Sequence, residues 1–221
     1  AALTEADPLN KLTLKVTGAA TATDLTALSG KTDIAVDATK VTAITGALAD
    51  VTAAIIDPAT KVTTAANVAV TIEDPISAIQ ANTIAKLTTG VVTATVADAS
   101  ASYLNTTLKD AKATDALKLT VIGTTATAAD LNALDGKTKE VITVKATKIE
   151  GTLADLNKVF VDVVTSTHFD VAATTKNVNI TDKTVTADAV SKIGVAAGTA
   201  VVKATVTADS AANLVSALEN T

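Results

Sequence analysis

The sequence predicts an α/β fold in which short parallel strands alternate with short helices. Three observations lead to this prediction. First, the phrase TATDLTALSGKT at residues 21–32 returns as TAADLNALDGKT at residues 127–138, so part of the chain is internally duplicated. Second, strand-like runs recur at a step of about two dozen residues, which is the length range of solenoid repeats. Third, an amphipathic segment with helical spacing follows most of these runs.

The strand-like runs are short, and most alternate between aliphatic and polar residues. In the first run, Leu12, Leu14 and Val16 are expected to point inward, and Thr13 and Lys15 outward. The sheet is therefore expected to have one aliphatic face and one face of threonine and lysine. The predicted strands are residues 12–16, 34–36, 68–72, 91–96, 117–121, 141–144, 178–180 and 201–206.

An aspartate marks the expected start of each helix, at positions 24, 50, 74, 98, 130, 155, 188 and 209. Threonines three residues earlier, at 21, 71, 95, 127 and 152, resemble capping boxes with Asp at the third helical position. Pro75 suits a first helical position. Gly30 and Gly136 are expected to end two of the helices.

So short a step between strands favours parallel strands stacked coil on coil, with the helices on the opposite side, where a coil is one strand and the helix after it. Two longer steps each follow the second strand of a half, so residues 1–116 and 117–221 are interpreted as tandem four-coil blocks. We predict one continuous α/β solenoid of about eight coils, leucine-rich-repeat-like in architecture. The alternative is an all-β solenoid in which the Ala-rich segments are turns.

Composition narrows the possible functions. Hydrophobic residues make up 48% of the chain and aromatic residues 1%, so Ala, Val, Ile and Leu must form the core. A net charge of −5, the lack of arginine and the few aromatics argue against nucleic acid binding. No apolar run is long enough to span a bilayer, so membrane insertion is not expected. The absence of Met, even at position 1, is expected of a processed or excised piece of a longer protein.

The sequence offers few metal or cofactor ligands. Calcium needs several oxygens converging from one loop, but the chain has no DxDxDG run and no GGxGxD repeat. Asp33, Asp37 and Asp135 are the candidates for a calcium site. We expect no other cofactor, and zinc is excluded because the chain has one histidine and no cysteine.

No catalytic residues are predicted, and the chain is not expected to be an enzyme. His168 lies beside Ser166 and Asp170, an arrangement that suggests a hydrolase, but neighbours in sequence do not make a triad. On a strand these three residues would merely share a face. We therefore expect an ordinary exposed histidine.

Two long coils, residues 57–67 and 162–177, occupy equivalent places in the two blocks. Insertions of this kind project as loops on one face of a solenoid, and such loops often bind partners. A monomeric adhesin segment would use them for binding. The structural alternative is that each supplies an extra strand covering an edge.

The two ends of the predicted solenoid lack polar caps. Uncapped end coils would expose strand edges and apolar core, so they would bind either further repeats of the same chain or another copy joined head to tail. The sequence therefore predicts a fibre. The residues expected at this contact are Leu12, Leu14, Val16, Val202, Val206, Leu214 and Leu218.

The phrases at 21–32 and 127–138, with ITGALADV at 44–51 and IEGTLADL at 149–156, resemble the Ala/Thr/Val-rich repeats of large secreted cyanobacterial cell-surface proteins. The resemblance implies an extracellular structural, adhesive, S-layer-like or motility-associated role at the cell surface. It carries over no catalytic residues. Some relatives also hold calcium in glycine-rich nonapeptides, which this chain lacks.

Overall fold

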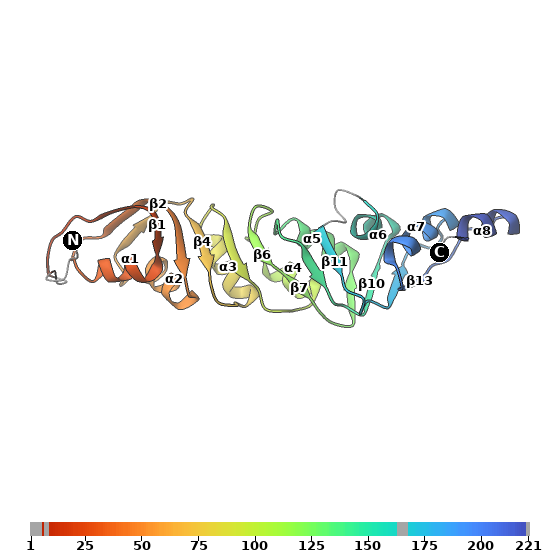
Figure 1. Ribbon diagram of the computed structural model, residues 1–221, viewed down its shortest axis with the longest axis horizontal. Coiled ribbons are helices and arrows are strands. Elements are labelled where there is room, and N and C mark those ends of the chain that lie inside the picture. Colours follow the sequence, from red (N-terminus) through yellow and green to blue (C-terminus); the bar gives the residue numbers. More distant parts are fainter. Residues whose placement is uncertain (1–5, 7–8, 163–167, 220–221) are drawn as a thin grey trace. The chain divides into compact units, whose positions relative to one another are not determined.

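The computed structural model describes residues 6, 9–162 and 168–219 and shows a mixed α/β protein whose strands pair in parallel. The chain divides into two compact units. The N-terminal unit comprises Ala1–Val96 with Thr114–Leu117, and the C-terminal unit comprises Ala97–Ala113 with Lys118–Thr221. Figure 1 traces the strands and helices in sequence colours, with α8 following α7.

The N-terminal unit has one main sheet. Its strand order is β1-β2-β4-β5-β6, and β3 pairs with the first part of the long strand β2. The elements are β1 (Lys15–Thr21), α1 (Ala22–Ser29), β2 (Val36–Gly46), α2 (Leu48–Ile55), β3 (Val62–Thr64), β4 (Ala69–Ile72), α3 (Ala78–Leu87) and β5 (Val92–Thr95), with β6 at Ala116–Lys118.

The C-terminal unit has two sheets, with strand orders β13-β12-β10-β8 and β11-β9-β7. Its helices α4 to α8 pack against one another in chain order. The elements are α4 (Ala101–Thr107), β7 (Thr120–Val121), β8 (Thr125–Thr127), α5 (Ala128–Asp135), β9 (Ile142–Val144), β10 (Lys148–Gly151), α6 (Leu153–Phe160), β11 (Phe169–Val171), β12 (Asn177–Ile180), α7 (Ala187–Ala197), β13 (Val201–Lys203) and α8 (Ala211–Leu218).

The mixed α/β class is confirmed, because Ala-rich segments form α-helices such as α2 and α5 rather than turns. The strands are more numerous than the sequence predicts. β3, β8, β10 and β11 are strands that the sequence analysis omits, and the predicted strand at 117–121 is divided between β6 and β7. The omitted strands have three or four residues each, too few for alternation to distinguish them from loops.

The core consists of aliphatic side chains stacked from strand to strand. In the N-terminal unit, Ile44, Val70 and Val92 occupy matching register positions on neighbouring strands, and all three are fully buried. Parallel pairing in register places side chains of one kind above one another, so this alternation yields a continuous apolar stack.

Threonine capping is confirmed for three of the helices. Thr21, Thr127 and Thr152 each accept a hydrogen bond from the backbone N–H three residues later, at the predicted aspartate. Three of the predicted starts are wrong. α3 begins after Ser77, α4 after Ser100 and α8 after Ser210, because a serine hydroxyl caps each of these helices. Pro75 consequently precedes α3 instead of opening it, and Asp98 precedes α4.

No helix in the part of the chain that the structure describes combines the length and apolarity needed to cross a membrane.

Candidate functional site

The first group of predicted assembly residues lies on and just before β1. Leu12, Leu14 and Val16 are half-buried, and they alternate with exposed Thr13 and Lys15 as the sequence predicts. β1 stands first in the strand order of its sheet, beside β2. An edge strand of this kind presents backbone groups and apolar side chains to a further strand.

The second group lies in the last repeat, which we define as residues 201–218 with β13 and α8. Val202, Val206, Leu214 and Leu218 are half-buried. α8 contains no buried residue, and Val215 on this helix is 61% exposed. β13 stands at the edge of its sheet, beside β12.

The register of the sheet shows how far this edge differs from the interior. Ile149, Val178 and Val202 occupy matching positions on β10, β12 and β13. Ile149 and Val178 are fully buried, whereas Val202 is only half-buried. The last repeat thus carries aliphatic side chains like those of the core. Among the described residues, a neighbouring strand, β12, pairs with β13 on one side only.

Side-chain hydrogen bonds join neighbouring helices of the C-terminal unit. The Asn105 amide on α4 donates to Asp130 Oδ1 on α5 over 3.1 Å. The Asn132 amide on α5 donates to Asp155 on α6, at 3.2 Å to the carbonyl oxygen and 3.4 Å to Oδ1. Asp130 and Asp155, near the starts of α5 and α6, therefore also bond the preceding helix, a role that the sequence analysis did not anticipate.

Two other aspartates cap a helix that precedes them in the chain. Asp74 Oδ2 accepts from the backbone N–H of Leu48 at the start of α2 over 3.3 Å. Asp182 Oδ2 accepts from the N–H of Leu153 at the start of α6 over 2.6 Å. The spacing of Asp74 to Thr71 predicts that Asp74 opens its own helix, α3. In the structure its carboxylate instead accepts a hydrogen bond from the start of α2.

Buried threonines also tie neighbouring turns of chain together. Thr88 Oγ1 donates to the carbonyl of Val68 over 2.5 Å and accepts from the N–H of Gly90 over 2.9 Å. A hydroxyl that satisfies two buried backbone groups fixes the spacing of the chain there. The buried threonines are Thr32, Thr88, Thr138 and Thr175.

The structure gives Asp33 and Asp37, two of the calcium candidates, different partners. Asp33 forms an exposed ion pair with Lys61, and this hydrogen-bonded ammonium lowers the pKa of Asp33. Asp37 Oδ1 accepts from the hydroxyl of Thr39 over 2.6 Å and from its N–H over 3.1 Å. These bonds, the hydroxyl first, lower the pKa of Asp37.

Asp135, the third calcium candidate, contacts the histidine. Its Oδ1 lies 2.6 Å from His168 Nδ1, and the His168 side chain is 50% exposed. An exposed histidine agrees with the prediction, and its partner is Asp135 rather than Asp170. Ser166 lies outside the described residues. In the described part of the chain, no group of three or more His, Cys, Asp or Glu side chains could hold a metal ion.

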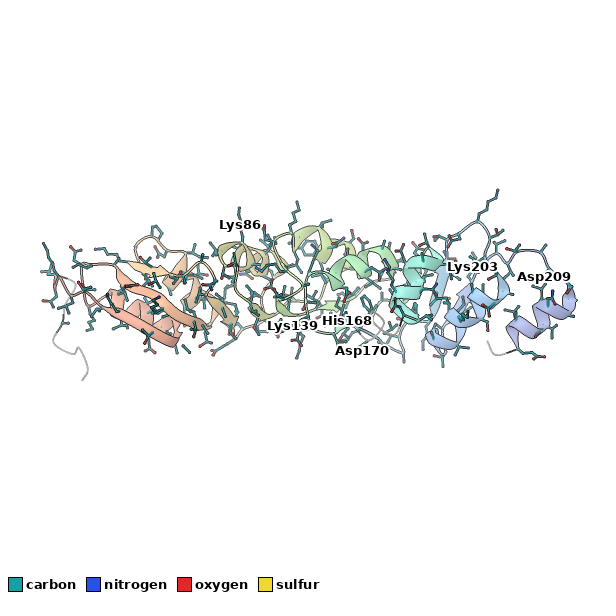
Figure 2. The ribbon with its side chains drawn as sticks, turned by 90° about the horizontal axis from the view of Figure 1, so that it is seen from above. Lys86, Lys139, His168, Asp170, Lys203 and Asp209 are labelled. Atoms are coloured by element: carbon teal, nitrogen blue, oxygen red, sulfur yellow. The ribbon has the colours of Figure 1, made fainter. Side chains whose placement is uncertain are left out.

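The charged side chains of the C-terminal unit do not converge on one point. In the view of Figure 2, Lys139, His168 and Asp170 are labelled near one another, whereas Lys203 and Asp209 lie farther along the unit. The Asp209 carboxylate accepts from the amide of its own helix residue Asn213, and this bond is the main reason why the pKa of Asp209 is lowered. The contacts of His168 with Asp135 and of Asp209 with Asn213 are separate pairs, which is typical of a solvated surface.

Both predicted long coils contain a strand. The segment 57–67 contains β3, which pairs with β2, and the described part of 162–177 contains β11, which pairs with β9. Each segment therefore lengthens a row of parallel strands, as the structural alternative expects. Residues 163–167 of the second long coil lie outside the described residues.

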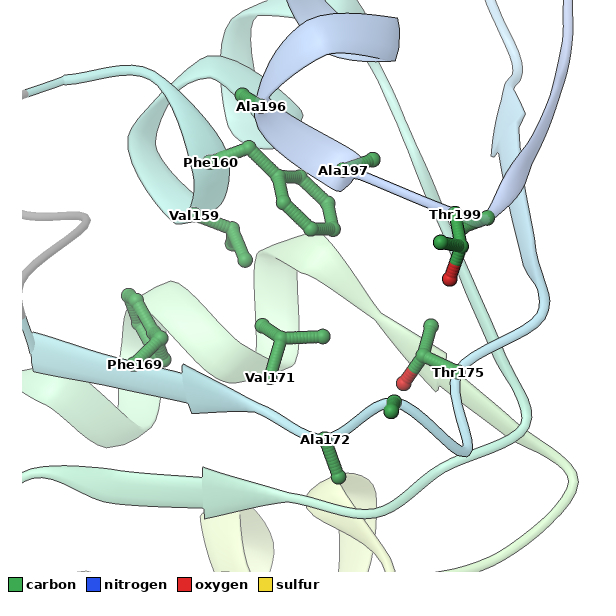
Figure 3. A pocket seen from close by; sticks show the side chains of 11 residues that line it. Val159, Phe160, Phe169, Val171, Ala172, Thr175, Ala196, Ala197 and Thr199 are labelled. Atoms are coloured by element: carbon green, nitrogen blue, oxygen red, sulfur yellow. The ribbon is translucent and has the colours of Figure 1, made fainter.

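The second long coil also borders a hollow of about 310 Å³ between α6, β11 and the end of α7. Figure 3 shows the ring of Phe160 facing this space, with Phe169 and Val171 on β11 and Thr175 and Thr199 on the adjoining loops. Both phenylalanines of the chain line it. Most of the side chains that line it are apolar, but the surface exposed to the hollow is more polar than apolar, so the lining does not favour one class of ligand.

Comparisons with protein-family models, with curated proteins and with solved structures gave no match.

Proposed function

We propose that this chain is a non-enzymatic structural solenoid that assembles head to tail into an extracellular filament or surface layer. The observation that carries the proposal is the last repeat. Its β13 stands at a sheet edge and its α8 has no buried residue, although both carry the aliphatic pattern of the interior repeats. We propose that a second copy completes this half-covered core.

The solenoid part of the proposal rests on the local order of each unit. Parallel strands follow one another in register, helices α4 to α8 pack in chain order, and four helices alternate with strands both in 15–107 and in 116–218. We propose that these elements form about eight coils in the two tandem blocks predicted from the sequence. Because two strands precede several of the helices, such a coil contains more than one strand and one helix.

Hydrophobic burial would supply the driving force for assembly. Burial of apolar surface contributes about 25 cal/mol per Å², and an additional parallel strand would satisfy the backbone groups of an open edge. Neither contribution depends on a metal, so we propose assembly without a cofactor. We also propose, as the sequence leads us to expect, that the assembly is extracellular and that the chain has no catalytic activity.

Electron microscopy of the untagged chain, with and without a calcium chelator, tests the proposal. We expect long unbranched fibres in both conditions. The variant Leu14→Asp should abolish them, because it places a charge on the half-buried side of the first strand. Thr13→Asp is the matched control, since Thr13 is the exposed neighbour, and fibres should persist. Discrete particles at every concentration for the native chain would contradict the proposal.

A second candidate function is a monomeric adhesin segment, and the hollow beside the long coil 162–177 favours it. A small side chain of a partner would enter between Phe160 and α7. Beads coated with the native chain should then adhere to a target cell surface. Ala196→Glu, which places a charge on the lining of the hollow, should remove this adhesion, while Leu14→Asp should leave it intact.

A further inference from the structure

We propose that the second copy docks on the last repeat in one particular register, the register that joins α4 to α5 within each chain. In this arrangement α1 of one copy packs against α8 of the copy before it. The inference rests on the proposed head-to-tail assembly and adds its geometry. The reason is that α4 and α5, which resemble α8 and α1 in sequence, already pack together within the chain.

The two helices on the supporting side of the junction match in sequence. Residues 100–108, SASYLNTTL, align without a gap with residues 210–218, SAANLVSAL. Ser100 and Ser210 both cap their helices, each accepting from the backbone N–H three residues later. α8 therefore has the same serine cap and the same leucine spacing as α4.

The two helices on the docking side match as well. Residues 127–138, which contain α5, align with residues 21–32, which contain α1. Thr127 and Thr21 bond the third residue of their helices in the same way. At the other end, the N–H of Lys137 donates to Leu134 O and the N–H of Lys31 to Leu28 O. α1 therefore repeats both ends of α5.

The internal junction is held by burial and by two polar contacts. Leu104 and Leu108 are fully buried. The Asn105 amide donates to Asp130 Oδ1, and Lys137 Nζ donates to the carbonyl of Leu108 over 2.9 Å. The last of these contacts satisfies a carbonyl just beyond the end of α4.

A second copy offers the same groups to α8. Its Lys31 stands at the position of Lys137, and its Asp24 stands at the position of Asp130. Leu214 and Leu218, half-buried in one chain, would become buried as Leu104 and Leu108 are. One protein chain thus supplies both halves of the joint, which is the condition for a heterologous contact that does not close.

The two segments differ at five positions, and one of these positions bears a side-chain contact of the internal junction. Val215 on α8 replaces Asn105 of α4, so the carboxylate of the docking Asp24 meets a methyl group instead of an amide. Asp24 Oδ2 already accepts from the hydroxyl of Thr21 over 2.7 Å, as Asp130 Oδ2 does from Thr127. The joint between copies therefore lacks a polar contact that the internal joint has, which makes it the weaker of the two.

This difference gives a gain-of-function test. Val215→Asn should restore the missing bond to Asp24 and lower the critical concentration for fibre formation about tenfold, because hydrogen bonds to charged groups are among the stronger ones. Adding Asp24→Ala to Val215→Asn should remove the gain. Ile79→Asn is the matched control, since Ile79 on α3 is also 61% exposed but lies away from the joint, and it should leave the critical concentration unchanged.

Crosslinking checks the register independently of affinity. The chain has no cysteine, so one population carrying Val215→Cys and another carrying Asp24→Cys can be mixed and treated with a short bismaleimide. A covalent dimer of the two populations is expected, and Ile79→Cys mixed with Asp24→Cys should give none.

The outcomes separate the inference from the proposed function. Fibres that form in the native chain but are not tightened by Val215→Asn, and that give no crosslinked dimer, would overturn the register and leave head-to-tail assembly standing. Absence of fibres for the native chain and all variants would overturn both.

Discussion

The helices α4 and α8 have closely similar sequences but different surroundings. Leu104 and Leu108 of the α4 region are fully buried, whereas their counterparts Leu214 and Leu218 are half-buried. α4 packs against α5, the helix that follows it, whereas α8 packs against α7, the helix that precedes it. In this protein, therefore, the aliphatic pattern alone does not bury a residue. Full burial also requires a following repeat that packs against it.

The largest expected effect comes from removing a leucine at the two matched positions. Leu104→Ala should lower the free energy of unfolding by about 2–5 kcal/mol, because it leaves a cavity in a fully packed site. Leu214→Ala should cost the dispersed chain about 1 kcal/mol or less, since that side chain is already half-exposed. Urea titrations followed by circular dichroism measure both.

The same pair of variants becomes a test of assembly at higher concentration. If a second copy covers α8, Leu214→Ala should raise the concentration needed for fibres while leaving the dispersed chain folded. Equal destabilisation of the dispersed chain by the two substitutions would show that α8 is already packed like α4 and would remove the contrast.

The next largest effect is expected where two turns of chain approach closely. A Cβ added to Gly90 would lie 2.5 Å from the carbonyl oxygen of Val68, well inside van der Waals contact. Gly90→Ala should therefore destabilise the chain by about 1–3 kcal/mol. Ala200 holds the aligned position before β13 and lines the 310 Å³ hollow, which shows that the last repeat is more loosely packed there.

Gly136→Ala is the control for this substitution. The added Cβ would lie 3.6 Å from the carbonyl of Ala133, an ordinary contact, so the midpoint of the urea transition should stay nearly unchanged. A midpoint for Gly90→Ala as high as that of Gly136→Ala would mean that the two turns separate easily.

Much of the fold could be predicted from sequence because its signals are local. Alternation placed the aliphatic faces, and Thr21 and Thr127 were identified as caps from the aspartate three residues on. The strands β8 and β10 were missed because three or four residues carry too little alternation, so pairing with neighbouring strands decides their conformation. Ser77 was missed because Asp74 offered a competing start signal.

The candidate site was predicted less completely than the fold. Periodicity predicts that Leu14 and Leu214 face inward, and the expected lack of a neighbouring coil at each end predicts that they are only half-buried. The bonds between helices, such as that of Asn105 to Asp130, join residues 25 apart in sequence, and no local pattern in one repeat reveals its partner in the next. The hollow at Phe160 arises from three separate elements.

A smaller effect is expected at the buried threonines. Thr88→Val removes the hydroxyl that bonds Val68 O and Gly90 N–H and should cost about 1–2 kcal/mol, because two buried backbone groups lose their partner. Thr207 Oγ1 donates to the carbonyl of Val185 over 3.2 Å in the exposed last repeat. Thr207→Val should shift the urea midpoint little, since water can replace that hydroxyl. Equal shifts for the two variants would remove this difference between interior and last repeat.

The smallest effect concerns the surface, where Lys61 pairs with Asp33. The hydrogen bond and charge of Lys61 lower the pKa of Asp33 below its usual 3.8, so the pair stabilises the fold above that pH and loses its effect as the pH falls through the lowered pKa. Lys61→Met should raise the Asp33 pKa back toward 3.8, as measured by carbon-13 NMR of the carboxyl groups. The pKa of Asp37 should not move, because Thr39 and not Lys61 lowers it. Because the Lys61 and Asp33 side chains are 46% and 57% exposed, the unfolding midpoint at neutral pH should hardly change. A large loss of stability would show that surface pairs, and not the aliphatic stack, hold neighbouring turns together.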